Sequence, residues 1–331
     1  MPDPDPDRLE ALSGEARRSW HEFLLVYEPL RPELYRYCRY LTRSPWDAED
    51  LAQDALAQAF TTLSRMGHAP PNPRAWLFRV ASNLWIDRVR RERVVANREP
   101  ATGPGTSSAD PQATREVVST LLGQLGPQER AAVVLKDVFE LSLDEVAEAL
   151  ATTIGAVKAA LHRGRGKLEE PEAYAEKRAV PEVVSAFCAA FNAQDIPGMT
   201  ALLLDHAVIE VVSATVESPT DGKVLRGMLF GSQRMARAAE LGGMEARFVA
   251  GVQPTPPRME LVTSRGEPLL LSWYAHEDGE AVRAVNRVEV SDGRISTLRN
   301  YFFTPDLIEE VCRELGLPFR SNGYRWWLPP R

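Results

Sequence analysis

The chain has 331 residues, of which 44% are hydrophobic and 26% are charged, and its formal net charge is -7 at pH 7. These values are typical of a globular protein with enough chain for two or three domains. The sequence contains no long uninterrupted apolar run, which argues against a transmembrane helix.

The chain begins with MPDPDPD, an acidic and proline-rich stretch that is the opposite of a secretory signal. Its three cysteines, Cys38, Cys188 and Cys312, lie far apart and have no histidines close to them. This spacing argues against a disulfide framework or a zinc site and favours a reducing cytoplasm. We therefore expect a cytoplasmic protein without a structural metal or a cofactor.

Changes in composition along the chain predict its domain organisation. Helical periodicity occurs twice, separated by a linker rich in Pro, Gly, Ser and Thr, and a strand-like pattern follows a short charged connector. The expected parts are a polar leader with a disordered first portion (1–20), helices (21–93), the linker (94–111), helices (112–168), the connector (169–179) and an α+β region (180–331).

The first strong helical pattern is DAEDLAQDALAQAFTTL, which begins at Asp47. Its apolar residues recur every three or four positions and form one stripe. The opposite face is acidic and polar, with no basic residue before Arg65; it carries Asp47, Glu49, Asp50, Gln53, Asp54 and Gln58. Such a face either binds a partner or is simply solvated.

An arginine-rich helix follows, with the sequence NPRAWLFRVASNLWIDRVRRER. Only Asp87 and Glu92 oppose its positive charge, although the whole chain is acidic. Guanidinium groups can hold phosphates, and aromatic side chains can stack on unpaired bases, so the segment favours a nucleic-acid partner. The alternative is a solvated charged face with ordinary core aromatics. The side chains concerned are Arg74, Trp76, Phe78, Arg79, Trp85, Arg88, Arg90, Arg91, Arg93 and Arg98.

The segment LSLDEVAEALATTIGAVKAALHRGRGKL predicts a helix-turn-helix. Ser142 and Glu145 form a capping box at the start of the first helix, and Thr153 is an N-cap for the second. We expect Ile154, Val157 and Leu161 to face inward. Small residues early in the second helix and cations later suit the DNA major groove, although a helical hairpin without a DNA role has the same apolar pattern. Its predicted outer face includes Ala156, Lys158, His162, Arg163 and Arg165.

Together these segments resemble an extracytoplasmic-function RNA polymerase sigma factor. DAEDLAQDALAQAF and the arginine-rich helix resemble the family's region two, and LGQLGPQERAAVVLKDVFELSLDEVAEALATTIGAVKAALHRGRGKL resembles its region four. The resemblance covers about residues 21–168 and implies two all-α DNA-binding domains. One departure is the loop GHAPPNPRAW, where Pro70, Pro71 and Pro73 replace a more usual Gly- and Ser-rich stretch.

The resemblance implies a role for each matching segment. The acidic helix would dock on core RNA polymerase, the arginine-rich helix and its loop would open and read the minus-ten element, and the helix from Ile154 would read the minus-thirty-five element. The residues implied for polymerase binding are Asp50, Gln53 and Asp54. Those implied for the minus-ten element are Arg74, Trp76, Arg79, Asn83, Arg88, Arg90, Arg91 and Arg93. Those implied for the minus-thirty-five element are Thr153, Ala156, Lys158, His162, Arg163 and Arg165.

The third region begins with an amphipathic helix over residues 181–193 with Val184, Phe187, Cys188 and Phe191 inward. Strand-like runs follow, Asp292-Gly293 is a predicted turn, and a last helix is expected from Thr304, its N-cap, and Pro305. AAFNAQDIPGMTALLLDHAVIEV and SDGRISTLRNYF resemble the SnoaL-like domain, which implies an α+β cone around an apolar pocket. The runs are AVIEVVS, EARFVAG, RMELVTS, PLLLSWYA, AVRAVNRVEV and RISTLRNYFF.

Related domains are either polyketide cyclases and isomerases or non-catalytic modules, and acid-base catalysis would need a polar group facing the pocket. Strand alternation predicts that Asn286 faces inward with Val282, Ala284 and Val288. The candidates for the pocket are His206, Tyr274, Asn286, Arg299 and Tyr301.

Taken together, the sequence predicts a transcription initiation factor that is not an enzyme. Its expected partners are core RNA polymerase and promoter DNA, its third domain would modulate it in cis, and a small-molecule ligand of that domain is left open. The alternatives are a small-molecule cyclase or isomerase with a DNA-binding appendage and, less well, a simple helix-turn-helix repressor.

Overall fold

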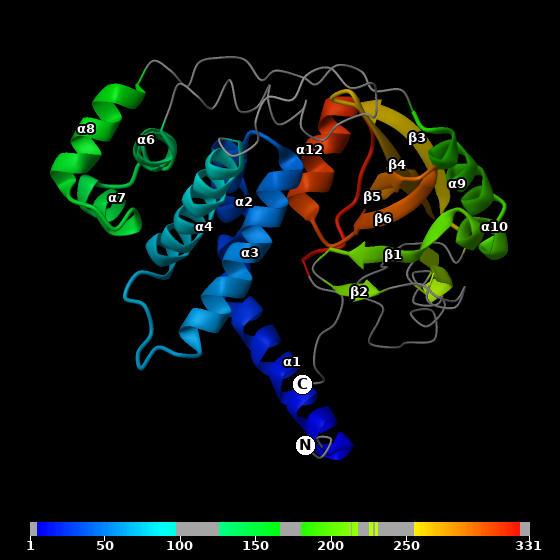
Figure 1. Cartoon of the computed structure of the whole chain (residues 1–331), viewed down its shortest axis with the longest axis horizontal. Coiled ribbons are helices and arrows are strands. Elements are labelled where there is room, and N and C mark those ends of the chain that lie inside the picture. The colour runs from blue at the N-terminus through cyan, green and yellow to red at the C-terminus, as the bar shows by residue number, and fades with distance from the viewer. Residues whose placement is uncertain are drawn as a thin grey trace. The chain divides into compact units, whose positions relative to one another are not determined.

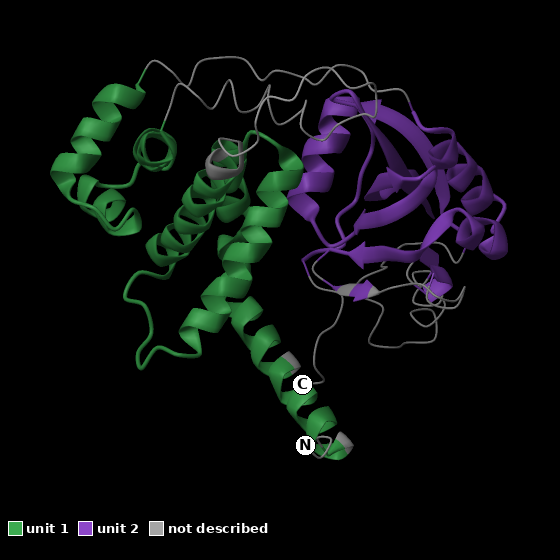
Figure 2. Ribbon diagram, viewed as in Figure 1, with its two compact units in different colours: residues 1–173, 331 green, residues 174–330 purple. Residues whose placement is uncertain are grey.

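The computed structural model describes residues 5–96, 126–165, 180–212, 214–217, 225–227, 229–230 and 255–324. The chain divides into two compact units, which we call unit 1 (residues 1–173 and 331) and unit 2 (residues 174–330) (Figure 2). The predicted connector over 169–179 lies outside the described residues. Of the predicted linker, only 94–96 are described, and they belong to a helix.

Unit 1 begins with four α-helices, labelled in Figure 1. The first, α1, starts at Pro6, whereas helix was expected only from residue 21, so the predicted leader is helical over most of its length. The reason is local, because the Asp5 carboxylate accepts a hydrogen bond from the Asp7 amide (3.2 Å) and Pro6 occupies the first helical position. The helices are α1 (Pro6–Tyr27), α2 (Arg31–Thr42), α3 (Pro45–Leu63) and α4 (Pro73–Ala96), with a 3₁₀ turn at Glu28–Leu30.

Aromatic side chains join α1 to α3 and α4. The ring of Trp20 meets that of Phe60 edge-on with 5.2 Å between centroids, and Phe23 meets the same ring at 5.5 Å. Tyr27 lies 6.0 Å from Trp76 of α4. Edge-on and tilted packing of this kind is favoured by the ring quadrupoles, so α1 is anchored through its C-terminal half.

One charged pair is buried between α2 and α3. Arg31 and Glu49 form a salt bridge, and their side chains are only 5% and 1% exposed. Glu49 was predicted to lie on the solvated acidic face of α3, and this prediction is wrong. Its partner is 18 residues away in the sequence, so helical periodicity gives no indication of the pairing.

The rest of unit 1 is a second group of short helices. The predicted capping box is present, because the Ser142 hydroxyl accepts from the Glu145 amide (3.1 Å) while the Glu145 carboxylate accepts from the Ser142 amide (2.8 Å). The predicted N-cap is also present, since the Thr153 hydroxyl accepts from the Ala156 amide at 3.2 Å. The elements are α6 (Pro127–Val133), a π-helix (Val134–Val138), α7 (Leu143–Ala149) and α8 (Ile154–Gly164).

Unit 2 contains one six-stranded sheet with helices packed on it. The strand order is β2-β1-β6-β5-β4-β3, in which β1 and β6 are parallel and the other neighbours are antiparallel. The α+β class predicted for a SnoaL-like domain is confirmed. The elements are α9 (Glu182–Asn192), α10 (Ile196–Ala201), β1 (Leu203–Val211), β2 (Thr215–Glu217), β3 (Arg258–Ser264), β4 (Glu267–His276), β5 (Gly279–Ser291), β6 (Arg294–Tyr301) and α12 (Pro305–Leu315).

The predicted inward face of α9 packs as expected, since Phe187 and Phe191 enter a core shared with Leu270 and Leu298 of the sheet. The predicted Asp292-Gly293 turn joins β5 to β6, with φ values of 51° and 72°. Thr304 occupies the N-cap of α12, but its side chain makes no capping hydrogen bond, contrary to the prediction. The strand predicted at 245–251 lies outside the described residues.

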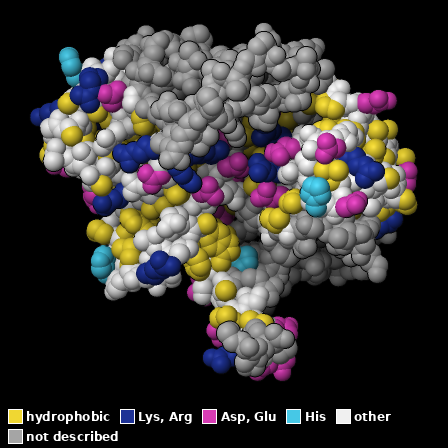
Figure 3. All heavy atoms as spheres, in the orientation of Figure 1, with side chains coloured by type: hydrophobic (Ala, Val, Ile, Leu, Met, Phe, Trp, Pro, Cys, Tyr) yellow, Lys and Arg dark blue, Asp and Glu magenta, His cyan; other side chains and the backbone are white. Residues whose placement is uncertain are grey.

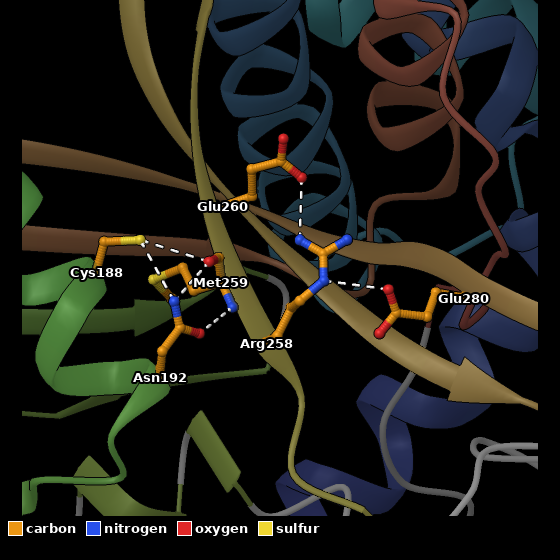
Figure 4. A network of polar contacts seen from close by, with 6 residues as sticks. All are labelled: Cys188, Asn192, Arg258, Met259, Glu260 and Glu280. Atoms are coloured by element: carbon orange, nitrogen blue, oxygen red, sulfur yellow. Dashed lines mark hydrogen bonds and ion pairs between the residues drawn. The ribbon is translucent and has the colours of Figure 1, made fainter.

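Polar contacts fasten α9 to the edge strand β3 (Figure 4). Asn192 accepts a hydrogen bond from the Met259 amide (2.7 Å) and donates one to the Met259 carbonyl oxygen (2.9 Å). The Cys188 thiol lies 3.5 Å from the same carbonyl oxygen and is half-buried rather than fully inward as predicted. The neighbouring residue of Met259, Arg258, forms salt bridges with Glu260 and with Glu280, each at 3.1 Å.

No helix in the described ranges has both the length and the hydropathy that crossing a bilayer requires.

Candidate nucleic-acid and polymerase interface

The acidic residues predicted to bind polymerase lie on consecutive turns of α3. Asp54 is exposed, and Asp50, one turn earlier, is half-buried. Gln53 donates a hydrogen bond to the buried Glu49 at 2.7 Å, so its side chain is tied to the core pair. Neighbouring atoms partly desolvate the Asp54 carboxyl and raise its pKa, and the positive charge of Arg88 acts in the opposite direction. The two aspartates therefore remain as the accessible anionic part of this face.

Several predicted minus-ten arginines already contact carboxylates. Arg74 bonds to Glu33 of α2 at 2.6 Å, and Arg88 bonds to Asp47 of α3 at 3.1 Å. Arg90 lies 3.6 Å from Asp87 on its own helix. These ion pairs are partly or largely exposed and are therefore weak and sensitive to salt.

Arg79 and Asn83 differ from the paired arginines. Arg79 is half-buried and Asn83 is exposed, and neither makes a hydrogen bond or ion pair with another residue of the described ranges. Arg91 is exposed and bonds to the Asp87 carbonyl oxygen at 3.3 Å. The side chain of Arg93 lies outside the described part of the chain. Arg79 and Asn83, near the middle of α4, are therefore polar side chains of this helix that no neighbouring protein group engages within the described ranges.

The aromatic residues of α4 are mostly core residues. Phe78 is 1% exposed and Trp85 is 3% exposed, so neither ring can stack on a base. For these two rings the alternative interpretation, ordinary core aromatics, is the right one. Trp76 is only half-buried, and its ring is the one of the three that remains partly accessible.

The helix α8 has one buried side and one exposed side. Val157 and Leu161 are inward as predicted, but Ile154 is 37% exposed, which corrects its assignment to the inner face. Ala160 and Gly164 are buried with Val157, so the inner stripe is set by these later positions. Its predicted DNA-contacting residues are all exposed: Thr153, Ala156, Lys158, His162, Arg163 and Arg165.

Arg163 of α8 and Arg165, the C-cap residue of that helix, are paired within unit 1. Arg163 contacts Glu129 of α6, and Arg165 makes two bonds to Asp137 of the π-helix at 2.8 and 3.1 Å. Hydrogen bonding and charge attraction from Asp137 raise the pKa of Arg165. Figure 3 shows basic side chains over α8 with acidic ones among them. Sequence reasoning missed these carboxylates because they lie 34 and 28 residues from their arginines.

The pocket candidates of unit 2 do not come together. In the sheet register Asn286 faces Asn300 and Val285 faces Tyr301, so Asn286 and Tyr301 project from opposite faces. Arg299 shares the face of Tyr301 and pairs with Glu210 at 3.2 Å. His206 is exposed on β1.

Asn286 does face inward, as predicted, and is fully buried. Its side-chain amide donates to the Leu270 carbonyl oxygen (2.8 Å) and to the Ser272 hydroxyl (3.0 Å). Its oxygen accepts a hydrogen bond from Asn300 at 2.7 Å. Tyr274 lies near this network in a small apolar cluster with Ala284. The described residues contain no group of three or more His, Cys, Asp or Glu side chains placed to hold a metal ion.

Comparison with known proteins now adds to this geometry. The family model for Sigma-70 region 2 matches residues 26–94, and that for Sigma-70, region 4 matches residues 115–168. The first model thus covers α2, α3 and most of α4 but almost none of α1, and the second covers α6, α7 and α8.

Three sigma factors illustrate the relationship. ECF RNA polymerase sigma factor SigG of Mycobacterium tuberculosis is 30% identical over 231 residues, which cover 57% of this chain and 61% of SigG. The RNA polymerase sigma-E factor of Streptomyces coelicolor is 31% identical over 140 residues, covering 41% of this chain and 78% of the relative. SigJ of M. tuberculosis is 28% identical over 286 residues, covering 75% of this chain and 89% of SigJ.

The crystal structure of M. tuberculosis SigJ aligns with 86% of this chain and 97% of its own, at 24% identity and a TM-score of 0.29. Two findings identify the family: the 31% identity to sigma-E over 78% of that protein, and the match to both sigma-70 family models. The chain belongs to the extracytoplasmic-function (ECF) family of RNA polymerase sigma factors.

Proposed function

We propose that this chain binds core RNA polymerase and directs it to a small set of promoters, after which it dissociates. The observation that carries the proposal is the presence of both sigma-70 models, in order, on residues 26–94 and 115–168. Relatives that match these regions are named as RNA polymerase sigma factors. Because the chain spans 61% of the length of SigG, the activity of the whole protein is part of the proposal.

Polymerase binding is assigned to the acidic face of α3. Asp50 and Asp54 lie one turn apart, and Asp54 is exposed. A pair of carboxylates on a rigid helix complements a basic helical surface and accelerates the encounter with it. Gln53 contributes through packing, because its amide is held by Glu49.

Minus-ten recognition is assigned to α4 and the loop before it. The loop ends with an N-cap, since the Asn72 side chain accepts from the Ala75 amide at 3.0 Å. Arg79 and Asn83 provide donors without competing carboxylates, and the exposed arginines further along the helix hold phosphates. A base taken out of the stack costs a few kcal/mol, which contacts in a pocket must offset.

Minus-thirty-five recognition is assigned to α8. Gly155 and Ala156 are exposed in its first turn, where small side chains allow the backbone to approach base edges. Lys158 and His162 follow on the exposed side and can reach flanking phosphates. The positive end of the helix dipole lies at the same first turn and also favours a phosphate group.

Unit 2 is proposed to modulate these activities in cis. The predicted connector is only about a dozen residues, and a tether of that length keeps the local concentration of an attached domain in the millimolar range. A small molecule bound within unit 2 would act by shifting this equilibrium. The cyclase or isomerase alternative is not proposed, because its candidate residues are divided between two faces of the sheet and solvent.

The test is run-off transcription with purified core RNA polymerase on promoters selected from a genomic fragment pool. The full chain and a version ending at Glu170 are compared, since the compact units divide close to that residue. Specific starts with either protein support the proposal, and their ratio gives the sign of the effect of unit 2. The absence of a specific start with both proteins contradicts it.

A second test addresses the polymerase surface. We expect Asp50→Lys with Asp54→Lys to weaken binding to core polymerase by roughly 100-fold, since two favourable charge contacts become repulsive. Thr61→Lys is the matched control, because Thr61 is exposed on the same helix about two turns beyond Asp54. Equal binding by the control and the double variant would exclude this surface.

A further inference from the structure

The first residue of α8, Ile154, is an exposed aliphatic side chain at the start of the helix that is assigned to the minus-thirty-five element. It is 37% exposed, whereas Val157 and Leu161 of the same helix are 1% and 5% exposed. The Thr153 hydroxyl accepts a hydrogen bond from the Ala156 amide at 3.2 Å, which fixes the point at which the helix begins. A single exposed aliphatic residue is ordinary on a protein surface, so its meaning depends on the residues around it.

The first turn of α8 presents no other extended side chain outward. Gly155 and Ala156 are exposed but carry no hydrogen-bonding side chain, and Val157 is buried. Small residues on this turn let the helix approach a groove closely. Lys158 follows Ile154 by four residues and therefore lies one turn later on the same face. At the end of the helix that contacts base edges in a helix-turn-helix, the available contact is therefore apolar.

The arginines of this segment are placed differently. Arg163 contacts Glu129, and Arg165 bonds to Asp137 at 2.8 and 3.1 Å. Arg163 is also nine residues from Ile154, or about 14 Å along the helix axis. An arginine usually reads guanine through two hydrogen bonds to the O6 and N7 atoms of the base. Because these arginines are engaged by carboxylates and are distant from the first turn, they are better placed to contact flanking phosphates.

Thymine is the base that an aliphatic side chain can recognise. Its C5-methyl group projects into the major groove, where adenine, guanine and cytosine present hydrogen-bonding groups and no methyl group. Isoleucine is branched at Cβ and keeps nearly one χ1 rotamer in a helix, so it loses little side-chain freedom when it packs against such a group. The burial of one methyl group improves affinity about 4-fold. A contact of this kind discriminates between bases without a hydrogen bond or a charge.

We propose that Ile154 determines part of the specificity of this chain for its minus-thirty-five element by packing against the C5-methyl group of a thymine in the major groove. The proposal rests on the function proposed above and names a base that the element contains. Ile154 specifies the thymine, while Lys158 and His162 hold the phosphates that flank it. Because the Ile154 contact is uncharged, it releases no counterions and adds nothing to the salt dependence of binding.

The test uses duplexes selected from a random pool by the full chain in complex with core RNA polymerase. Each thymine of the selected minus-thirty-five element is replaced in turn by deoxyuridine, which differs only in lacking the methyl group. We expect one of these replacements to weaken binding of the holoenzyme about 4-fold in fluorescence anisotropy titrations. A selected element without thymine, or one in which no replacement weakens binding, would overturn the proposal.

Variants at Ile154 connect this effect to one side chain. Ile154→Ala should bind the selected duplex about 10-fold more weakly, because it loses most of the apolar contact, and should no longer respond to deoxyuridine. Ile154→Val keeps a branched aliphatic side chain and should retain most of the response. Val138→Ala is the matched control, because Val138 is an aliphatic residue of the π-helix that is similarly exposed, at 42%. The control should change neither the affinity nor the response.

Two further measurements separate base recognition from phosphate binding and from a structural role. Ile154→Ala should leave the logarithmic salt slope of binding unchanged, whereas Lys158→Ala should reduce it by about 0.9. Ile154→Ala should also leave the urea unfolding midpoint unchanged, because the side chain is exposed. A lower midpoint, together with equal deoxyuridine responses in the variant and the original chain, would assign Ile154 to packing instead.

Failure of this proposal and failure of the proposed function give different results. Specific starts from the selected duplexes, with equal deoxyuridine responses in Ile154→Ala and the original chain, would overturn the role of Ile154 and leave initiation in place. A response that disappears in Ile154→Ala, without a specific start from any duplex, would support that role and contradict initiation. Selection of no duplex from the pool would contradict both.

Discussion

The two basic helices of unit 1 have similar compositions but different structural roles. In α4, Leu77, Phe78 and Trp85 are core residues, and some of its arginines pair with carboxylates of α2 and α3. In α8, the inner side is short and the outer side begins with small exposed residues. A basic helix can thus be a core helix that also carries cations, or a surface helix with one exposed side of small and cationic residues. The difference decides which substitutions report on DNA binding alone.

The largest expected effect is at the core of α4. Phe78→Ala should lower the free energy of unfolding of unit 1 by about 3–5 kcal/mol, because it removes a large buried ring. Urea denaturation of the full chain, followed by far-ultraviolet circular dichroism, measures the change. A loss below about 1 kcal/mol would show that α4 is not the core helix described above.

The comparison predicts the opposite behaviour for α8. Ala156→Trp should leave the unfolding midpoint unchanged, since Ala156 is exposed, but should weaken binding to a minus-thirty-five element by roughly 100-fold, near the upper end of what one base contact contributes. Fluorescence anisotropy with intact and scrambled elements separates the specific loss from a general one. Equal weakening on both duplexes would place α8 outside the groove.

Within α4, variants of Arg79 and of Arg74 can be compared directly, because only Arg74 of the two is paired with a carboxylate. Arg79→Ala should weaken promoter binding several-fold and reduce its salt dependence by about 0.9 in the logarithmic slope, because it removes one cation from the proposed DNA surface that no carboxylate neutralises. Arg74→Ala should have a smaller effect on binding, since Arg74 is already paired with Glu33. Binding titrations of the holoenzyme at several salt concentrations give both slopes. Identical slopes for the two variants would contradict the distinction.

The smallest effect is expected at the start of α7. Ser142→Ala should cost about 1 kcal/mol of stability by removing a cap. Hydrogen bonds from Ser142 lower the pKa of Glu145 below its ordinary value of 4.5. The contribution of this carboxylate is therefore present above that value and is lost as the pH falls through the lowered pKa. The stability gap between Glu145→Gln and the original chain should therefore narrow in acid, and a constant gap from pH 7 to 3 would argue against the carboxylate.

The sequence predicted structural features correctly where the interacting residues are close together along the chain. The capping box of Ser142 and Glu145, the N-cap Thr153 and the Asp292-Gly293 turn each depend on residues a few positions apart, and each is present. The first and last residues of β3 are those of the predicted RMELVTS run. The inward direction of Asn286 followed from simple alternation along β5.

Errors arose where a partner is distant in the sequence. Glu49 looked solvated because its partner Arg31 is on another helix. Ile154 looked inward because periodicity does not show that α8 packs against α6 with Val157 and Ala160 buried instead. The burial of Phe78 and Trp85 depends likewise on helices that periodicity does not place. The roles assigned to the DNA- and polymerase-binding residues stay predictions, because no bound partner is present to test them.

The paired amides of Asn286 and Asn300 in unit 2 have a consequence for strand alignment. They face each other across β5 and β6, and each is satisfied only in this register. A slip of one residue would turn one amide to the opposite face and leave the other buried without its partner, at a cost of about 1–3 kcal/mol for each unsatisfied group. The two asparagines thus favour a single register between β5 and β6. Loops at either end of the sheet can then change in length or sequence without altering how its strands are aligned.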